Sequence, residues 1–323
     1  MTPDARILRQ LRQRDSVAAS DLSRAANMNE RELLTRIGEL RSLGYDISST
    51  PHQGFRLVAS PDLLHADDLI SRLGETRVIG RDIRVFSETT STNDVAEKLA
   101  RDGVREGMVI FAESQTKGRG RMGRHWMSPP GKGLWFSVLV RPRLSPQAAT
   151  QLTVIGATAV ARAIREQTGL TPQIKWPNDI LIRGKKAVGI LTEMSAELDR
   201  VRHVTLGIGV DVNVKEFPME LRDVATSLAI ETGRELDRAE LAAAILHQLD
   251  VDYARVCENQ FASIAEEWEQ QCITLGRRVR IHEGDRTLTG RAESLAPDGA
   301  LLLRTDHGHL ERIIGGDVLI ENA

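Results

Sequence analysis

The chain has little cysteine and no long apolar stretch. Its 323 residues include two cysteines, Cys257 and Cys272. Two thiols cannot build a disulfide framework or a cysteine-rich metal site. No run approaches the roughly 18 apolar residues of a membrane span, and the N-terminus lacks the apolar segment of a signal peptide. We therefore expect a cytoplasmic protein that does not cross a membrane.

An excess of charge of one sign is also missing. The chain carries 43 Lys and Arg against 45 Asp and Glu, for a net charge of -2. This balance argues against a protein coated all over by nucleic acid. Internal repeats and low-complexity tracts are absent from the sequence as well. The length predicts two or three domains with enough chain for a hydrophobic core.

The most informative segment is residues 115–126, which read QTKGRGRMGRHW. Its cations are Lys117, Arg119, Arg121 and Arg124, and they alternate with the glycines Gly118, Gly120 and Gly123. Glycines give the backbone freedom, and arginines supply charge-assisted donors for anions. The pattern predicts a loop that closes over a polyanion such as a nucleotide phosphate.

Two familiar glycine motifs fit this loop in spacing but not in context. The three glycines match G-x-G-x-x-G, yet Pro129 and Pro130 follow closely and exclude the helix that a dinucleotide site needs. A P-loop would need Lys-Ser/Thr where Arg124 and His125 stand. A solvated basic loop or a nucleic-acid patch remains the plain alternative, although it does not explain the neighbouring Trp126.

A second motif, Lys-Trp-Pro-Asn-Asp, occupies residues 175–179. Apolar runs at 180–182 and 187–191 flank Gly184, so the sequence predicts two strands joined by a tight turn. That hairpin would hold Lys175, Asp179 and Lys186 close together. A solvated turn is the plain alternative. The polar residues 90–93 begin a helix that extends to about Ala100, where their hydroxyls can act as caps.

Taken together, these segments closely resemble the biotin protein ligases. The resemblance covers nearly the whole chain and is carried by residues 91–93, Gln115, 118–126, 175–179, Lys186 with Gly189, and 207–213. It implies that biotin is joined to the AMP of ATP with release of pyrophosphate. The biotinyl group then passes to a lysine of a biotin carboxyl carrier protein.

The resemblance also implies site residues. Biotin would contact Ser91, Thr92, Asn93, Gln115, Arg119, Gly120, Arg121, Lys186 and Gly189. ATP would contact Gly118, Arg119, Arg121, Arg124, Trp126, Lys175, Asn178 and Asp211. Arg121, Lys186 and Asp179 would be catalytic, with Asp179 also a Mg²⁺ ligand. Within this set, Arg119 and Arg121 would hold the biotin carboxylate and the phosphate linkage, and fixed cations of this kind stabilise charge that develops in the transition state.

One position departs from the family pattern. Asp211 stands where the family usually has asparagine. A carboxylate near nucleotide phosphates is unfavourable unless magnesium or an arginine compensates. The predicted nucleotide contact at Asp211 is therefore the one most open to question.

The expected fold class is α+β, in four parts. Residues 1–60 would form a winged helix-turn-helix, 61–74 a linker helix, 75–271 a mixed α/β catalytic domain for biotin and ATP, and 272–323 a small SH3-like β-barrel. In the catalytic part we expect strands near 83–85, 109–111, 134–140, 180–182, 188–191 and 206–212, with helices at 145–168 and 237–257. Glycine-punctuated short strands indicate the C-terminal barrel.

The first 60 residues have the helix order of a DNA-binding module. We expect a first helix around Leu8, a second capped by Ser20, a third capped by Asn29, and two strands flanking the turn at 50–54. This order resembles the N-terminal domain of bifunctional family members, which also repress transcription. DNA contacts would come from Arg31, Thr35 and Arg36, whereas glutamates on the same helix oppose phosphate.

Two alternative functions remain at this point. One is a winged-helix regulator that senses biotin without ligase activity, and the other is a lipoate or octanoate ligase of related fold. Operator DNA and a second copy of the chain in a homodimer are the further partners considered.

Overall fold

The computed structural model describes residues 1–50, 53–198 and 200–321. The chain forms two compact units, residues 1–75 with 237–243, and residues 76–236 with 244–323. Each unit has its own core, as expected for a chain of this length. Within the described ranges, no helix combines the length and apolarity needed to cross a bilayer.

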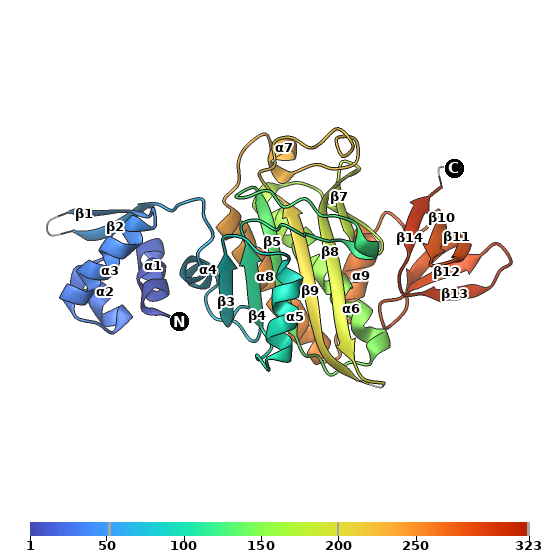
Figure 1. Cartoon of the computed structure of the whole chain (residues 1–323), viewed down its shortest axis with the longest axis horizontal. Helices are drawn as coiled ribbons and strands as arrows, with labels where there is room; N and C mark the ends of the chain where they lie inside the picture. Colours follow the sequence, from blue (N-terminus) through green and yellow to red (C-terminus); the bar gives the residue numbers. More distant parts are fainter. Residues whose placement is uncertain (51–52, 199, 322–323) are drawn as a thin grey trace. The chain divides into compact units, whose positions relative to one another are not determined.

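The described residues of the segment 1–75, the main part of the first unit, form four helices and a two-stranded antiparallel sheet (Figure 1). Its elements are α1 (Pro3–Gln13), α2 (Ala19–Ala26), α3 (Glu30–Ser42), β1 (Asp46–Thr50), β2 (Gly54–Ala59) and α4 (Ala66–Leu73). The apolar faces of α1, α2 and α3 meet at Leu8, Leu22 and Ile37, which are buried. The predicted helices and strands are confirmed, whereas Pro51 and His52 of the predicted turn lie outside the described residues.

The helix starts in this unit follow local hydrogen bonding. Asn29 caps α3 as predicted: its side chain accepts from the Glu32 amide at 2.9 Å, and Glu32 accepts from the Asn29 amide at 3.1 Å. The predicted cap at Ser20 is wrong, because α2 begins at Ala19 and its N-cap is Ala18. The amides of Asp21 and Leu22 both donate to the Ala18 carbonyl at 3.1 Å, so helical hydrogen bonding begins two residues before Ser20.

The second unit is built on a seven-stranded mixed sheet. In spatial order its strands are β3 (Asp82–Phe86), β4 (Met108–Ala112), β5 (Gly133–Val140), β9 (Val201–Asp211), β8 (Lys185–Ala196), β7 (Asp179–Ile182) and β6 (Gln173–Lys175). Only the β3–β4 pair is parallel among these pairings. Every residue of β4 and β5 is buried, so both faces of the sheet are covered at its centre.

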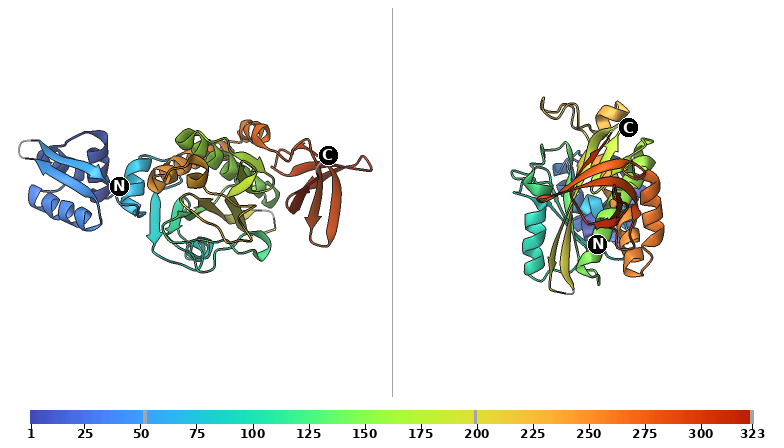
Figure 2. Two further views of the ribbon diagram at one scale, coloured as in Figure 1. Left: turned by 90° about the horizontal axis from the view of Figure 1, so that it is seen from above. Right: turned by 90° about the vertical axis from the view of Figure 1, so that its right-hand side faces the viewer.

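Helices cover the two faces of this sheet. Helix α5 (Thr92–Arg101) lies on one face; α6 (Thr150–Thr168), α9 (Ala262–Gln271) and the part of α8 (Arg238–Cys257) that belongs to this unit lie on the other (Figure 2). The predicted helix after residue 145 is confirmed: Ser145 caps the short 3-10 turn η2 (Pro146–Ala149), and α6 follows directly. The short helices η1 (Arg121–Gly123) and α7 (Leu228–Thr232) complete the unit. Strand β6 and helix α9 were not predicted.

Alternation along β8 and β9 decides which residues reach the face below α5. Side chains of successive strand residues point to opposite faces. Ile190 and Leu206 pack on Gly156 of α6, where an added β-carbon would lie 3.5 Å from both side chains. The intervening residues therefore face α5, and Gly189 pairs with Gly209 across the two strands. This face carries the candidate site.

The C-terminal part of the second unit is a five-stranded antiparallel sheet. Its strands are β10 (Arg278–Glu283), β11 (Arg286–Leu295), β12 (Leu301–Thr305), β13 (Leu310–Ile313) and β14 (Asp317–Ile320), in the order β13-β12-β11-β10-β14. Val279, Ile281, Leu301 and Leu303 are buried. The predicted short strands with glycine-containing turns are confirmed.

Candidate active site

A cavity of about 620 Å³ lies on the α5 side of the large sheet. The predicted residues that line it are Ser91, Thr92, Asn93, Gln115, Arg119, Gly120, Arg121, Arg124, Trp126, Lys175, Asn178, Asp179, Lys186, Gly189 and Asp211. They come from four separate stretches of chain. The fold thus brings together nearly all the residues that the sequence had assigned to biotin and ATP.

Gly118 is the exception, because it does not line the cavity. A β-carbon at this position would lie 2.4 Å from the Trp126 carbonyl oxygen and 2.9 Å from the Ser128 hydroxyl. The Gly118 carbonyl also accepts from the Trp126 amide at 2.9 Å. Gly118 therefore allows the two arms of the loop to approach closely, a role of backbone rather than of ligand contact.

The start of α5 forms a polar wall of the cavity. Ser91 is the N-cap by position, yet its side chain makes no capping bond. The free amide of Thr92 instead donates to Gln115 Oε1 at 2.9 Å, which satisfies a donor that a helix start leaves unpaired. Ser137 of β5, fully buried, lies 2.7 Å from Thr92 Oγ1 and 2.5 Å from Asn93 Oδ1. These groups form a fixed array of donors and acceptors.

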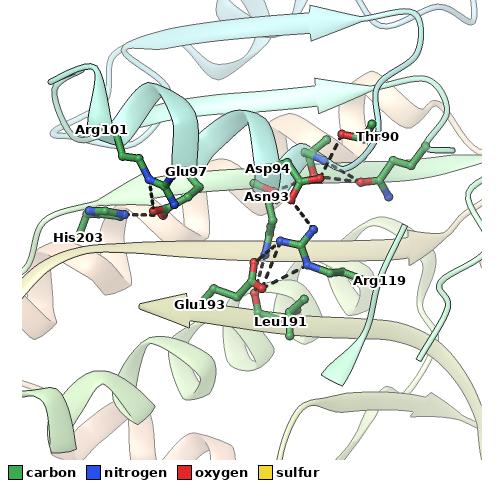
Figure 3. Close-up of polar contacts among 12 residues, drawn as sticks. Thr90, Asn93, Asp94, Glu97, Arg101, Arg119, Leu191, Glu193 and His203 are labelled. Atoms are coloured by element: carbon green, nitrogen blue, oxygen red, sulfur yellow. Dashed lines mark hydrogen bonds and ion pairs between the residues drawn. The ribbon is translucent and has the colours of Figure 1, made fainter. Parts of the chain in front are cut away.

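Asn93 lies directly on the sheet. A β-carbon at Gly207 would lie 2.3 Å from Asn93 Oδ1, so only glycine admits this side chain. The Asn93 amide nitrogen donates to Glu193 Oε2 at 2.7 Å (Figure 3). Glu193 sits four residues after Gly189 on β8, so strand alternation places both on the cavity face.

Arg119 is enclosed by carboxylates. Its Nη1 donates to Asp94 at 2.5 Å, and its Nη2 donates to Glu193 Oε2 at 2.9 Å (Figure 3). Burial alone lowers the pKa of Arg119, but the hydrogen bonds that its guanidinium donates to Glu193 and Asp94 outweigh burial and raise it. The guanidinium is a permanent charge tied to α5 and β8.

The other two loop arginines point toward different partners. Arg121 is half-buried and donates weakly to Asn178 Oδ1 at 3.4 Å. Burial lowers its pKa, although Asp317 and Asp179 act in the opposite direction. Arg124 forms an ion pair with Asp317 at the start of β14. A strand of the C-terminal sheet therefore takes part in holding the loop.

Trp126 lies over the glycines of β8 and β9. A β-carbon at Gly189 would lie 2.7 Å from its ring, and one at Gly209 would lie 2.6 Å from it. The Lys186 ammonium is 5.2 Å from the centroid of the same ring, a cation–π contact. The indole therefore packs on a floor that only glycines can form.

The β7–β8 hairpin positions the lysines as predicted. Its two-residue turn consists of Arg183 and Gly184, both with positive φ, of 50° and 82°. Such a turn matches the twist of the strands and places Lys186 Nζ 2.6 Å from Asp179 Oδ1. Lys175 pairs in register with Asp179 across β6 and β7. The predicted proximity of these three residues is confirmed.

Asp211 ends β9 inside the cavity wall and is only 5% exposed. Burial raises its pKa well above the ordinary value, and the Lys186 charge lowers it only in part. Arginine compensation was considered from the sequence; among the described residues, Lys186 is the cation that acts on this carboxyl.

Comparison with known proteins identifies the family. The profile of the Biotin/lipoate A/B protein ligase family matches residues 85–211, and that of the Biotin protein ligase C terminal domain matches residues 274–320. The Bifunctional ligase/repressor BirA of Bacillus subtilis (strain 168) is 38% identical over 304 residues, which are 94% of this chain and 93% of that protein. The chain belongs to the biotin protein ligase family.

Further relatives agree with this assignment. The Biotin--[acetyl-CoA-carboxylase] ligase of Mycobacterium tuberculosis is 33% identical over 247 residues, 74% of this chain and 89% of that protein. The solved biotin protein ligase from Aquifex aeolicus in complex with biotin and ATP is 31% identical, with a TM-score of 0.64 over 75% of this chain and 100% of that one. The mixed sheet and the C-terminal antiparallel sheet are thus those of a biotin protein ligase.

Several residues that contact the predicted site residues of this ligase were not predicted from the sequence, among them Asp94, Ser137, Glu193 and Asp317. Glu193 could have been found, because a period of two from Gly189 along β8 leads to it. Ser137 lies in a strand that reads as continuous core. Asp317 is 193 residues from Arg124, and nothing local in the sequence pairs them.

Proposed function

We propose that this protein is an ATP-dependent biotin protein ligase that forms biotinyl-5'-AMP and then biotinylates a lysine of a biotin carboxyl carrier protein. In the first step a biotin carboxylate oxygen attacks the α-phosphorus of ATP, and the bond to the pyrophosphate oxygen breaks. In the second step the neutral lysine amine attacks the acyl carbon, the bond from that carbon to the phosphate oxygen breaks so that AMP leaves, and the nitrogen releases one proton as the amide forms. The chain's membership of the biotin protein ligase family supports this reaction.

The single observation that carries the proposal is the layout of the cavity. One group of lining residues is the set of hydroxyl and amide side chains of Thr92, Asn93 and Gln115, which suits the donors and acceptors of a ureido ring. Another group consists of Lys186 and Arg121, cations that a carboxylate and a phosphate need when they approach each other. Both groups of residues line the same cavity, which supports binding of the two substrates side by side.

The three cations Lys186, Arg121 and Arg124 differ in shape and exposure, and each suits a different part of the substrates. Lys186 is a compact ammonium and suits the point where carboxylate and α-phosphate meet. Arg121 is planar and half-buried, which suits the phosphate linkage. Arg124 is exposed and suits the departing pyrophosphate. The predicted contact between Arg119 and the biotin carboxylate stays a prediction.

Magnesium is part of the proposal. The described residues contain no cluster of three or more histidine, cysteine or acidic side chains that could hold a metal ion. Mg²⁺ commonly needs only one or two carboxylates when nucleotide phosphates supply other ligands. Asp179 fits this limited role, with an Oδ1 atom that has Lys186 as its charged neighbour. When bound, the ion would neutralise phosphate charge.

A second candidate function is DNA-binding repression by the first unit. Its helices α2 and α3 and its β1–β2 pair fit a winged helix-turn-helix, and Arg31 and Thr35 are exposed on α3. Arg36 is partly engaged by Glu39 at 3.0 Å. Relatives matched over 94% of the chain bear the name ligase/repressor. We also retain the four-part domain division, an SH3-like C-terminal barrel and a homodimer as proposals.

The test is pyrophosphate release from ATP and magnesium with biotin, lipoate or octanoate in turn, with no carrier present. Mass spectrometry would identify any retained adenylate. A stoichiometric burst with biotin alone supports the ligase. Biotin binding without a burst would favour a sensing regulator, and a burst with lipoate or octanoate would replace the substrate. A gel-shift assay with DNA from the organism's biotin genes, with and without biotinyl-AMP, tests repression separately.

A further inference from the structure

The Arg119 guanidinium has little capacity left for a substrate. Its Nε donates to Glu193 Oε1 at 3.2 Å, its Nη2 to Glu193 Oε2 at 2.9 Å, and its Nη1 to Asp94 Oδ1 at 2.5 Å (Figure 3). All three nitrogens of the side chain are therefore engaged with protein carboxylates. The two carboxylates and one guanidinium sum to a charge of about -1, on formal charges at neutral pH. A substrate carboxylate brought to Arg119 would also meet Glu193 and Asp94.

Glu193 makes a second contact that orients Asn93. Its Oε2 accepts from Asn93 Nδ2 at 2.7 Å, and the Asn93 oxygen faces the Ser137 hydroxyl at 2.5 Å. With a pure acceptor on one side of the amide, only the nitrogen can point toward Glu193. Glu193 therefore decides which way the Asn93 amide faces the cavity, although Glu193 itself is not among the residues that line it.

Arg119 also lies where the two halves of the loop, residues 118–120 and 124–126, are joined by backbone hydrogen bonds. It forms a backbone bridge with His125, and the neighbouring Gly120 amide donates to the Arg124 carbonyl at 2.7 Å. The Trp126 amide donates to the Gly118 carbonyl at 2.9 Å. Fixing the side chain of Arg119 on α5 and β8 therefore fixes both arms, and with them Trp126.

We propose that Glu193 is a positioning residue for biotin, which holds Asn93 and Arg119 together and so anchors the loop of residues 117–126 to α5 and β8. Arg119 then serves as the anchor of this loop, and the positive charge for the biotin carboxylate comes from Lys186 and Arg121. Asp94 completes the anchor from the helix side. The part concerning biotin rests on the proposed function; the part concerning the loop does not.

The first test is Glu193→Gln, with Glu197→Gln as its matched control. Glu197 accepts from Arg200 and Arg202 at 2.8 and 2.6 Å in the same β8–β9 hairpin, away from the cavity. We expect Glu193→Gln to raise the biotin Kd about fivefold, the size of one partly exposed charged contact, and to leave the ATP Kd within about twofold. If Arg119 instead binds the biotin carboxylate, Glu193→Gln would release the Arg119 guanidinium from a competing carboxylate and lower the biotin Kd. That result would overturn the proposal.

The second test separates anchoring from direct contact. Biotin and biotinol, the alcohol that lacks the carboxylate, are compared on wild type and Arg119→Lys. A loop anchor predicts the same loss of affinity for both ligands, about fivefold. A loss seen with biotin but not with biotinol would show that Arg119 contacts the carboxylate, which contradicts the assignment. A double-mutant cycle between positions 119 and 193 should be strongly non-additive, since both changes break one anchor.

The third test needs no biotin. Trypsin cleavage within residues 117–126 of the full chain is timed for wild type, Glu193→Gln, Asp94→Asn and Glu197→Gln. The anchor predicts cleavage several-fold faster in Glu193→Gln and Asp94→Asn than in wild type, and unchanged in the control, at equal melting temperature. Equal rates in all four proteins would reject the anchor. A wild type that binds no biotin would reject the proposed function, while this cleavage result would still decide the anchor.

Discussion

At the residue scale, the ion pair between Lys186 and Asp179 joins the proposed cation for the biotin carboxylate and α-phosphate to the proposed Mg²⁺ ligand. The ammonium is 2.6 Å from the carboxylate and also faces the Trp126 ring, so its direction is fixed before substrates arrive. A preorganised cation of this kind stabilises developing charge without reorganising. The pair therefore contributes mainly to the reaction rate.

Replacing Lys186 should slow adenylate formation more than it weakens binding. We expect Lys186→Gln to lower the pyrophosphate burst rate about 100-fold, the cost of about 3 kcal/mol for one transition-state donor. Lys185→Gln is the matched control, because Lys185 donates outward to the Arg222 carbonyl at 2.7 Å. Stopped-flow measurement of the burst decides, and a burst equally fast in both variants would remove Lys186 from catalysis.

Asp211 gives a pH signature with a definite sign. Burial raises its pKa in the folded protein above the unfolded value of about 4. As pH rises past that unfolded value, the unfolded chain releases the proton first, so the wild type loses stability until the folded carboxyl also ionises. Asp211→Asn does not titrate. The melting temperature of Asp211→Asn minus that of wild type should therefore increase as pH rises. A difference in melting temperature that does not change with pH would contradict this prediction.

How far the sequence predicts single residues depends on where their partners lie. Asn29 with Glu32, and Asp179 with Lys186, are close in sequence, and their contacts follow from helix or hairpin geometry. The cap predicted at Ser20 failed because α2 begins after Ala18, a residue whose side chain offers no cap and gives no signal in the sequence. Contacts between distant segments escape for the same reason.

At the element scale, strands β8 and β9 work as one unit with the loop above them. Their paired glycines remove side chains where the Trp126 ring lies. The strands with strong apolar runs were predicted from the sequence, whereas the three-residue β6 offers too few residues for a pattern. Helix α9 buries only Ile264 and Trp268 along its length, so its apolar stripe is sparse.

A methyl group on this glycine floor should disturb the ring above it. Gly209→Ala would place a β-carbon 2.6 Å from the Trp126 indole, so the ring must move. We expect biotin affinity to fall about tenfold or more, with a change in tryptophan emission. Gly156→Ala on α6 is the control, since its β-carbon would meet Ile190 and Leu206 at 3.5 Å. That change should add up to about 1 kcal/mol of stability and leave biotin binding intact. Equal biotin affinities of the two variants would contradict the proposed packing of Trp126 on Gly209.

At the scale of the whole molecule, the candidate DNA contacts and the ligase site belong to different compact units. Arg31→Ala should therefore weaken retention of operator DNA and reduce its salt dependence, because one phosphate contact is lost. The pyrophosphate burst should stay within about twofold, as for a surface change. Arg105→Ala, an exposed arginine of the second unit, is the control. Filter binding at several salt concentrations decides, and equal retention by both variants would exclude Arg31.

The glycine floor also limits how the ligase can be redesigned. Gly189 and Gly209 are already the smallest residues available, so no substitution in that part of the sheet can enlarge the cavity. A variant meant to accept bulkier biotin analogues must gain its space from the roof, by shortening Trp126. Such a change would also remove the ring that faces Lys186, so wider substrate scope and the placement of the ammonium would have to be optimised together.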